Sequence, residues 1–436
     1  MHELTKLIRD DMKPALGVTE PAAIAFAVST ARNYVTGDVE NVTLYLNSGI
    51  YKNAFTCGIP GTGEVGNAYA AALGAVAADP EKGLECLEGI SEEEKQKAAR
   101  MVAENRIHVV MKEVTARIMI DAVVCTAGGS TAAVTIRDSH TNIVRITADG
   151  NIVYEKVKEP EKEGAQTAGE DCAMGEHALI HRYSLQQIYE YVVHVPAEEL
   201  AFISEAYRLN WELMQEGLRS EKTVFAHYLL EANGGVVISE DERRTASLLC
   251  NAAIEARVTG LARPAMSITG SGAHGIIATM PLYAVCKVRH LSEESLLRAT
   301  ALSYLVCMYL KEYSGRLSAF CGCAIAAGTG MACGLVFLRG GDAKAMGMAI
   351  SNMACSITGM ICDGGNQGCT MKGVVAVDAA FVSADMAMKQ VAVDRRHGIN
   401  AGTPEETMRN MGLIASPGMT GTEQTILDIL NQKGNE

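Results

Sequence analysis

Four cysteines in the last third of the chain are spaced so that they could hold a metal centre. Cys321 and Cys323 flank one glycine, and Cys362 and Cys369 bracket a loop with two adjacent glycines and a third at position 368. Glycine carries no Cβ, so such loops let several thiolates approach one centre without steric conflict. Three converging thiolates would suit an iron–sulfur cluster with one iron left open to a substrate. Zinc is the alternative, because Cys321 and Cys323 together could complete the closed set of four ligands that zinc favours.

A second polar segment runs from Ser267 to Pro281 and contains three glycines and several small hydroxyl residues at the start of an expected helix. Backbone N–H groups at a helix N-terminus bind carboxylates or phosphates. Ser271 and His274 lie where they could face such a ligand. The segment is not a Walker loop, because the Gly-Lys-Ser/Thr sequence is missing. The alternative is a closely packed helix start with a structural histidine.

Two further polar turns could contact a substrate. Tyr51, Lys52 and Asn53 open a long glycine-containing segment, and a lysine with a neighbouring amide could clamp a carboxylate. Arg316 interrupts two apolar runs shortly before the first cysteine pair and could bind a carboxylate near the metal. An ordinary surface turn is the alternative for both.

The composition restricts the function classes. The chain has 436 residues, of which 48% are hydrophobic, enough for two or three domains with sizeable cores. A net charge of −13 argues against nucleic acid or an anionic membrane as a partner. The 13 cysteines are scattered and odd in number, and the first residues are charged rather than typical of a secretory signal. We therefore expect reduced thiols and a cytoplasmic location, with a homo-oligomer as one alternative for the quaternary state.

The hydrophobic periodicity divides the chain into two parts. Residues 107–156 alternate with a period of two and predict an antiparallel meander. Residues 157–175 are polar and lack periodicity, as a linker would. Almost every later segment has a helical pattern, and many of these helices are apolar on most faces, which is typical of buried helices. We predict an α+β domain over residues 1–165, followed by an all-α domain over residues 166–436 that carries the cysteine pairs.

Taken together and in order, the motifs resemble the L-cysteine desulfidase family, the single-chain relatives of the α subunit of iron–sulfur-dependent L-serine dehydratases. The resemblance covers nearly the whole chain. The motifs that carry it are Pro14-Ala-Leu-Gly-Val-Thr-Glu-Pro21, Asn53-Ala54, Gly58-Ile-Pro-Gly-Thr-Gly63, Thr269-Gly-Ser-Gly-Ala-His-Gly-Ile276, Gly315-Arg-Leu-Ser318, Cys321-Gly-Cys323, and the segment from Cys362 to Cys369.

This resemblance implies a [4Fe-4S] cluster held by Cys362, Cys369 and one cysteine of the 321/323 pair, of which we favour Cys323. It implies a PLP-independent lyase that acts on a small amino-acid substrate, L-cysteine or L-serine, and gives pyruvate, ammonia and sulfide or water. Hydroxide and sulfide are poor leaving groups, and coordination to iron stabilises the charge that develops on them. The residues expected to bind the substrate are Glu20, Asn53, Ser271 and Arg316.

One position departs from the family pattern. The desulfidases carry a cysteine, assigned as their general base, where this chain has Val18, and valine cannot move a proton. We expect His274, Lys52 or Tyr51 to act as the base instead, and the reference pKa of about 6.5 suits histidine best for that task. The alternative function is a non-catalytic amino-acid or metal sensor that retains the cluster pocket.

Overall fold

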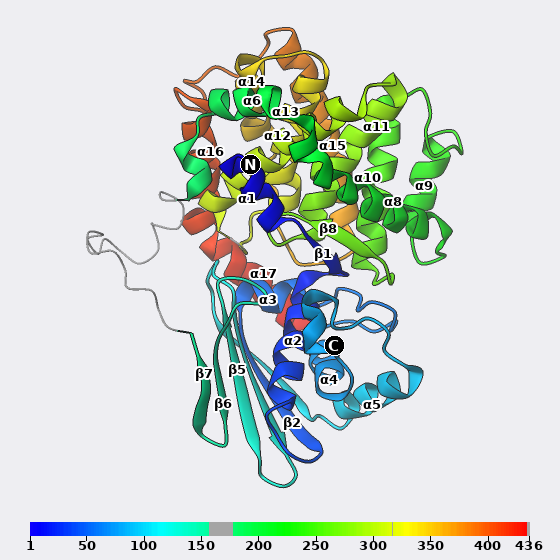
Figure 1. Ribbon diagram of the computed structural model, residues 1–436, viewed down its shortest axis with the longest axis vertical. Coiled ribbons are helices and arrows are strands. Elements are labelled where there is room, and N and C mark those ends of the chain that lie inside the picture. Colours follow the sequence, from blue (N-terminus) through cyan, green and yellow to red (C-terminus); the bar gives the residue numbers. More distant parts are fainter. Residues whose placement is uncertain (157–177, 316, 434–436) are drawn as a thin grey trace, which may run out of the picture.

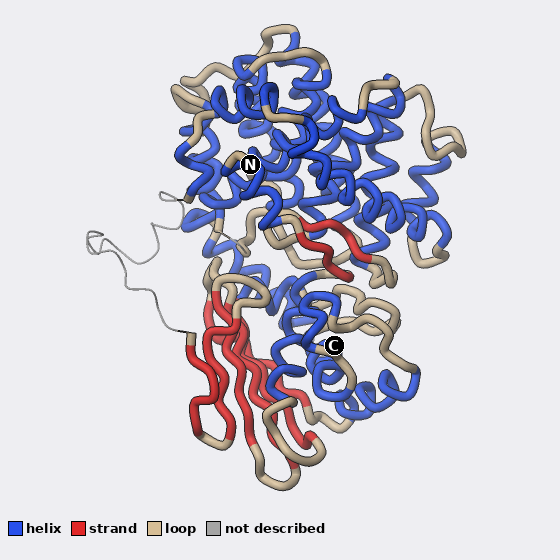
Figure 2. Tube along the Cα trace, viewed as in Figure 1, coloured by secondary structure: helices blue, strands red, loops and turns tan. Residues whose placement is uncertain are grey.

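The computed structural model describes residues 1–156, 178–315 and 317–433, which form a sheet-containing region and a helix-rich region (Figures 1 and 2). Each region has its own large hydrophobic cluster of buried side chains. The predicted fold class, an α+β part followed by an all-α part, is confirmed. The predicted domain boundary between residues 165 and 166 lies outside the described residues.

The sheet region is built on a six-stranded sheet with the strand order β3-β2-β4-β5-β6-β7. Strand β2 lies between β3, to which it is parallel, and β4, to which it is antiparallel. The meander predicted from residue 107 onward therefore begins only at β4. A period of two assigns the two faces of a strand but not its neighbours, so the insertion of β2 could not be read from its residues. The strands are β2 (Val39–Asn47), β3 (Ile107–Glu113), β4 (Met119–Thr126), β5 (Thr131–Arg137), β6 (Ile143–Ala148) and β7 (Asn151–Glu155).

Helices pack on the sheet and lead from it to the boundary with the helix-rich region (Figure 1). Helix α2 is buried along almost its whole length, and its first turn carries Glu20. The short helix α3 follows β2 directly and carries Lys52 and Asn53. The helices of this region are α2 (Thr19–Arg32), α3 (Ser48–Asn53), α4 (Asn67–Val76) and α5 (Glu92–Ala103).

In the helix-rich region, the other helices pack around the long, buried helices α11 and α12. Leu4 and Ile8 of α1 belong to its core, and β1 (Lys13–Leu16) pairs with β8 (Pro264–Ser267) before the chain crosses to the sheet region. The helices are α1 (Glu3–Asp11), α6 (Leu185–His194), α7 (Ala197–Leu200), α8 (Ser204–Arg219), α9 (Val224–Ala232), α10 (Glu242–Val258), α11 (Gly272–Arg289), α12 (Glu293–Ser314), α13 (Gly328–Leu338), α14 (Ala343–Ile357), α15 (Gly368–Met388) and α16 (Pro404–Leu413).

The last helix, α17 (Thr420–Lys433), returns to the boundary and packs against α3 (Figure 1). Both ends of the described chain therefore connect the two regions, α1 and β1 at the start and α17 at the end. Within the part of the chain that the structure describes, no helix combines the length and apolar character that a membrane crossing requires.

The packing of α13 on α12 depends on the absence of a side chain at Gly330. A Cβ atom at this position would lie 2.2 Å from the carbonyl oxygen of Ser303, a backbone atom that cannot yield without moving a helix. We expect Gly330→Ala to lower the free energy of unfolding by about 2 kcal/mol or more, measured by urea denaturation. Gly421→Ala is the matched control, because nothing lies within 4 Å of its Cβ position, and it should be neutral or slightly stabilising. An unchanged stability of Gly330→Ala would contradict this close contact.

Candidate functional site

A cavity of about 60 Å³ lies where the two regions meet and is lined by residues from both. All four cysteines of the two predicted pairs line it, together with Val18 from the sheet region. The other lining residues with charged or hydrogen-bonding side chains are Glu20, Asn53, Arg257, Ser271 and Lys372. The structure therefore brings together motifs that are separated by more than two hundred residues in the sequence.

Backbone hydrogen bonds hold the two cysteine-bearing loops side by side. The N–H of Cys321 donates to the carbonyl of Met360 at 3.0 Å, and the N–H of Cys362 donates to the carbonyl of Ala319 at 2.6 Å. A π-helical turn begins at Cys323 and leads into α13. Such turns are frequent at functional sites because they redirect side chains within a helix.

The glycine-rich loop after Cys362 packs directly on α3. A Cβ atom on Gly364 would lie 2.6 Å from the carbonyl oxygen of Lys52, and one on Gly365 would lie 2.9 Å from that of Asn53. Gly364 also has a φ of +110°, a conformation that L side chains rarely adopt. The thiol of Cys362 lies 3.8 Å from the Oδ1 atom of Asn53. The glycines of this motif are therefore required to bring the loop against α3.

The four thiols line one cavity without being grouped around a single point. Among the described residues, no three His, Cys, Asp or Glu side chains are grouped closely enough to hold one metal ion, although four thiols line one cavity. In a [4Fe-4S] cluster each thiolate binds a different iron, so the ligands surround a volume rather than a point. A closed zinc site needs four ligands on one ion. Burial raises the pKa of the Cys369 thiol to about 12, so metal binding must displace its proton.

Glu20 is a buried carboxylate that stays ionised. It is 5% exposed and accepts hydrogen bonds from Thr19 Oγ1 at 3.0 Å and from Asn53 Nδ2 at 2.9 Å. The Nε2 atom of His140 lies 3.7 Å from its Oε1 atom. Burial acts to raise the pKa of Glu20, but His140, Asn53 and Arg257 outweigh it and lower the pKa to about 2. Glu20 is therefore a fixed negative charge on the cavity wall and a weak base.

The lowered pKa of Glu20 predicts a loss of stability in acid. Its folded pKa of about 2 lies below its ordinary value of 4.5, so its ionisation stabilises the folded state above about pH 4.5 and less so as the pH falls towards 2. When the pH is lowered from about 6 to about 3, the unfolding free energy of the wild type should fall by about 2 kcal/mol more than that of Glu20→Gln, in which the side chain at position 20 does not titrate. Urea denaturation at both pH values measures this difference, and equal losses in the two proteins would contradict it.

Two cations on the cavity wall were not predicted from the sequence. Arg257, near the end of α10, is 4% exposed, and its Nε atom has no hydrogen-bond partner among the described residues. Lys372 follows Cys369 by about one turn of α15 and forms an ion pair with Asp363. Two features of the sequence could have indicated them. Arg257 is a charged residue within a segment of helical, largely apolar pattern, and Lys372 follows the candidate ligand Cys369 by three residues, so the two are neighbours on one helix face.

His274 lies behind the loop of the first cysteine pair and is not among the residues that line the cavity. Its Nδ1 atom is 2.5 Å from Thr269 Oγ1. Its Nε2 atom lies so close to Gly322 that a Cβ there would be 2.7 Å away. Burial, followed by the positive charges of Lys311 and Arg257, lowers the pKa of His274 well below its ordinary value. The imidazole is therefore neutral at pH 7.

Lys52 and Tyr51 face α17 rather than the cavity. The Lys52 Nζ atom lies 2.6 Å from Glu423 Oε2 and donates to the carbonyl of Ser318 at 3.2 Å. The Tyr51 hydroxyl donates to the Oδ1 atom of Asn431 at 2.8 Å. Neither residue lines the cavity that contains the thiols, so their predicted catalytic roles stay predictions.

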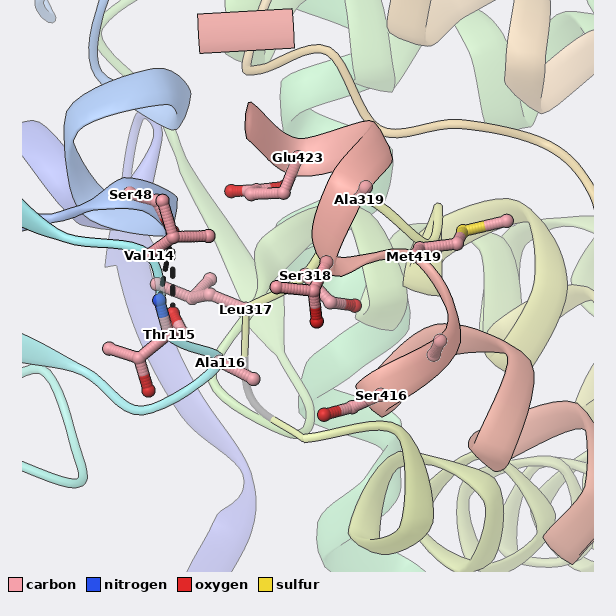
Figure 3. Close-up of a pocket in the computed structure, with 12 residues that line it drawn as sticks. Ser48, Val114, Thr115, Ala116, Leu317, Ser318, Ala319, Ser416, Met419 and Glu423 are labelled. Carbon is pink, nitrogen blue, oxygen red and sulfur yellow. Dashed lines mark hydrogen bonds between the residues drawn. The ribbon is translucent and has the colours of Figure 1, made fainter. Parts of the chain in front are cut away.

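The carboxylate of Glu423 also borders a second, smaller cavity of about 30 Å³. Figure 3 shows this cavity between Ser48 and the 114–116 segment on one side and the turn before α17 on the other. The Oε1 atom of Glu423 has no hydrogen-bond partner among the described residues. The buried ion pair with Lys52 thus links α3 to α17 at the boundary between the two regions.

The structure thus places three of the four predicted substrate-binding residues on one cavity with the predicted cluster ligands. Glu20, Asn53 and Ser271 line it, whereas Arg316 lies outside the described residues. Val18 lines the cavity as well, and its Cγ1 atom would lie 3.2 Å from a Cβ on Gly365. The position at which the desulfidases carry a cysteine therefore faces the thiol-lined cavity.

Comparisons with known proteins show which family the chain is similar to. A family model described as the serine dehydratase alpha chain matches residues 81–428. Proteins named UPF0597 protein are similar over almost their full lengths. One from Clostridium botulinum is 41% identical over 98% of both chains. Others from Caldanaerobacter subterraneus and Bacteroides fragilis are 35% and 34% identical, each over 99% of this chain and 98% of the relative.

Proposed function

Because this chain belongs to the serine dehydratase alpha chain family, we propose that it is an iron–sulfur-dependent, PLP-independent lyase that eliminates the β-substituent of an amino acid. The products would be pyruvate, ammonia and either water or sulfide. The observation that carries the proposal is that both cysteine pairs line one cavity whose wall also holds the buried charges Glu20 and Arg257. A thiol site for the cluster and charged groups for a zwitterion thus occur together.

Cys323, Cys362 and Cys369 are the proposed ligands of a [4Fe-4S] cluster. Cys321 is left out of this set because the resemblance places the ligand after a glycine and directly before the small-residue helix, where Cys323 lies. A hydrogen bond to Cys323, together with burial, raises the pKa of Cys321 well above the ordinary value. A protonated Cys321 can donate to a thiolate at position 323. When bound, such a cluster supplies a Lewis-acidic iron that assists departure of hydroxide or sulfide. Lys372 favours the ionised form of Cys362 and Cys369 through its positive charge.

His274 is the proposed proton acceptor. Its imidazole is neutral, as a base must be. It does not line the cavity but lies directly behind the cavity wall, against Gly322 between the first two cysteines. Lys52 is engaged by Glu423 and Tyr51 by Asn431. A carboxylate with a pKa of about 2, such as Glu20, is too weak a base for an α-proton.

The experiment that tests the proposal uses the full chain with its cluster reconstituted under anaerobic conditions. Pyruvate is measured with L-serine and L-cysteine as substrates, alongside other β-substituted amino acids. Turnover of at least one of them is expected. Binding of these compounds without pyruvate formation would instead support the alternative, an amino-acid sensor, which the valine at position 18 favours.

Val18→Cys should raise the activity towards L-cysteine. Val18 lines the cavity, so a thiol at this position would face the substrate as the desulfidase base does. A positioned base contributes about 10²- to 10⁴-fold to a rate. His274, the proposed base, already supplies part of this effect, so we expect sulfide release to rise about tenfold. Val28→Cys is the control, because Val28 is a buried position of α2, the helix that Val18 caps, and does not line the cavity. Unchanged sulfide release by Val18→Cys would count against the assignment of this position.

A further inference from the structure

Arg257 and Glu20 are buried opposite charges that line one cavity without pairing with each other. Arg257 is 4% exposed and Glu20 is 5% exposed. Among the described residues, no ion pair within 4.0 Å joins the two side chains, and the Nε atom of Arg257 has no hydrogen-bond partner. A buried charge is costly unless a partner is supplied. A negative group on a ligand would supply the missing partner of Arg257. A positive group on the same ligand would complement Glu20, which accepts hydrogen bonds from Thr19 and Asn53 and has His140 at 3.7 Å.

The N-terminus of α11 lies against the guanidinium and adds further donors for an anion. Its N-cap residue, Ser271, makes no side-chain hydrogen bond to the helix. The N–H groups of the first turn have no acceptor within the helix, and both Ser271 and Ala273 line the cavity. A Cβ atom on Gly272 would lie 2.7 Å from the Nε atom of Arg257. Glycine at this position therefore allows the guanidinium to approach the end of the helix.

We propose that Arg257 and the N-terminus of α11 bind the carboxylate of an α-amino acid, while Glu20 binds its ammonium group. An arginine fork and helix N–H groups match a carboxylate, and an ionised carboxylate held by Asn53 matches an ammonium. The ligand class is thus the α-amino-acid zwitterion. 2-Hydroxy acids should bind more weakly, because a hydroxyl offers Glu20 a neutral hydrogen bond in place of a charge-assisted one. The orientation of the β-substituent towards the thiols rests on the proposed function, whereas the binding of the zwitterion does not.

Binding of L-alanine tests this assignment without turnover, because L-alanine has no β-leaving group. Isothermal titration calorimetry of the anaerobically reconstituted full chain would compare L-alanine with three analogues. Ethylamine lacks the carboxylate, propionate lacks the ammonium, and L-lactate carries a hydroxyl in place of the ammonium. In the wild type, L-alanine should bind about tenfold or more tightly than each of the others. Charge-assisted hydrogen bonds of this kind correspond to about 10- to 100-fold in affinity.

Each variant should remove one part of this selectivity. Arg257→Met should weaken L-alanine binding about 10- to 100-fold and leave ethylamine unchanged. Glu20→Gln should abolish the preference for L-alanine over L-lactate. Gly272→Ala keeps the arginine but displaces it from the helix end, and it should weaken L-alanine binding in the same direction. Arg339→Met is the matched control. It removes an arginine whose side chain is 8% exposed and pairs with Glu242 and Asp385 outside the cavity, so its L-alanine affinity should equal that of the wild type.

Several results would overturn the assignment. Equal L-alanine binding by the wild type and Arg257→Met would do so, as would a wild type that does not bind L-alanine. Loss of iron and labile sulfide from Arg257→Met would assign this residue to the cluster instead. Pyruvate formation from L-serine separates this inference from the lyase function. Arg257-dependent binding of L-alanine without any pyruvate would remove only the lyase proposal, and pyruvate formation with unselective binding would remove only the zwitterion site.

Discussion

Cys369→Ser is expected to abolish the broad visible absorption of the reconstituted protein and to remove pyruvate formation. Cys369 is a proposed cluster ligand whose thiol lines the cavity, and serine lacks the soft sulfur donor that iron–sulfur clusters require. Lewis-acid assistance is worth several kcal/mol in the transition state, so the rate should fall by about 10³-fold or more. Absorption spectra, iron and labile-sulfide content, and pyruvate formation measure the effect.

Two cysteine variants serve as controls for this result. Cys355 is exposed and does not line the cavity, so Cys355→Ser should keep both the absorption and the activity. Cys321→Ser should keep the cluster if Cys323 is the ligand, and loss of the cluster in this variant would reassign that ligand. A Cys369→Ser protein with full iron content and wild-type turnover would refute the proposed cluster site.

Lys52→Met is expected to destabilise the fold by about 3–5 kcal/mol. The Nζ atom of Lys52 lies 2.6 Å from Glu423, and the two side chains are 0% and 5% exposed. Removal of the cation leaves a buried carboxylate uncompensated. Urea denaturation of the metal-free protein measures the loss without interference from the cluster. Hydrogen exchange should show the largest loss of protection in α17, which this pair holds against α3.

The double variant Lys52→Met/Glu423→Gln separates the ion pair from the packing. It should recover most of the lost stability, because neither partner is then charged. Lys97→Met is the matched control, since Lys97 and Glu93 form an ion pair with side chains 50% and 75% exposed, and such pairs contribute at most about 1 kcal/mol. A double variant as unstable as the sum of the two single variants would show that the pair is not the source of the effect.

The sequence predicted the helices well where apolar periodicity is continuous. The helical pattern expected after residue 175 is found, for example, in α10 (Glu242–Val258) and α12 (Glu293–Ser314). Helix α3 was missed because it is a single short run that follows β2 without a break. The place of β2 between β3 and β4 depends on pairing with strands more than sixty residues away, which no local pattern encodes.

Some residues of the candidate site could also be predicted from the sequence, whereas others could not. The thiols, Glu20, Asn53 and Ser271 belong to motifs, and the cavity brings them together. Lys52 precedes Asn53 by one residue, yet successive helical side chains point about 100° apart, so only Asn53 reaches the cavity. Arg257 belongs to no recognisable motif, because its role depends on contact with a helix end that follows a separate strand. Tertiary packing, rather than residue type, selects these neighbours.

Whether this chain is an iron–sulfur lyase is decided by anaerobic determination of iron, labile sulfide and zinc in the full chain, followed by a pyruvate assay on the same sample. We expect about four iron and four sulfide per chain, as a [4Fe-4S] cluster requires, and pyruvate from L-serine or L-cysteine. Zinc without labile sulfide would contradict the cluster. A fully loaded protein that forms no pyruvate from any β-substituted amino acid would contradict the lyase.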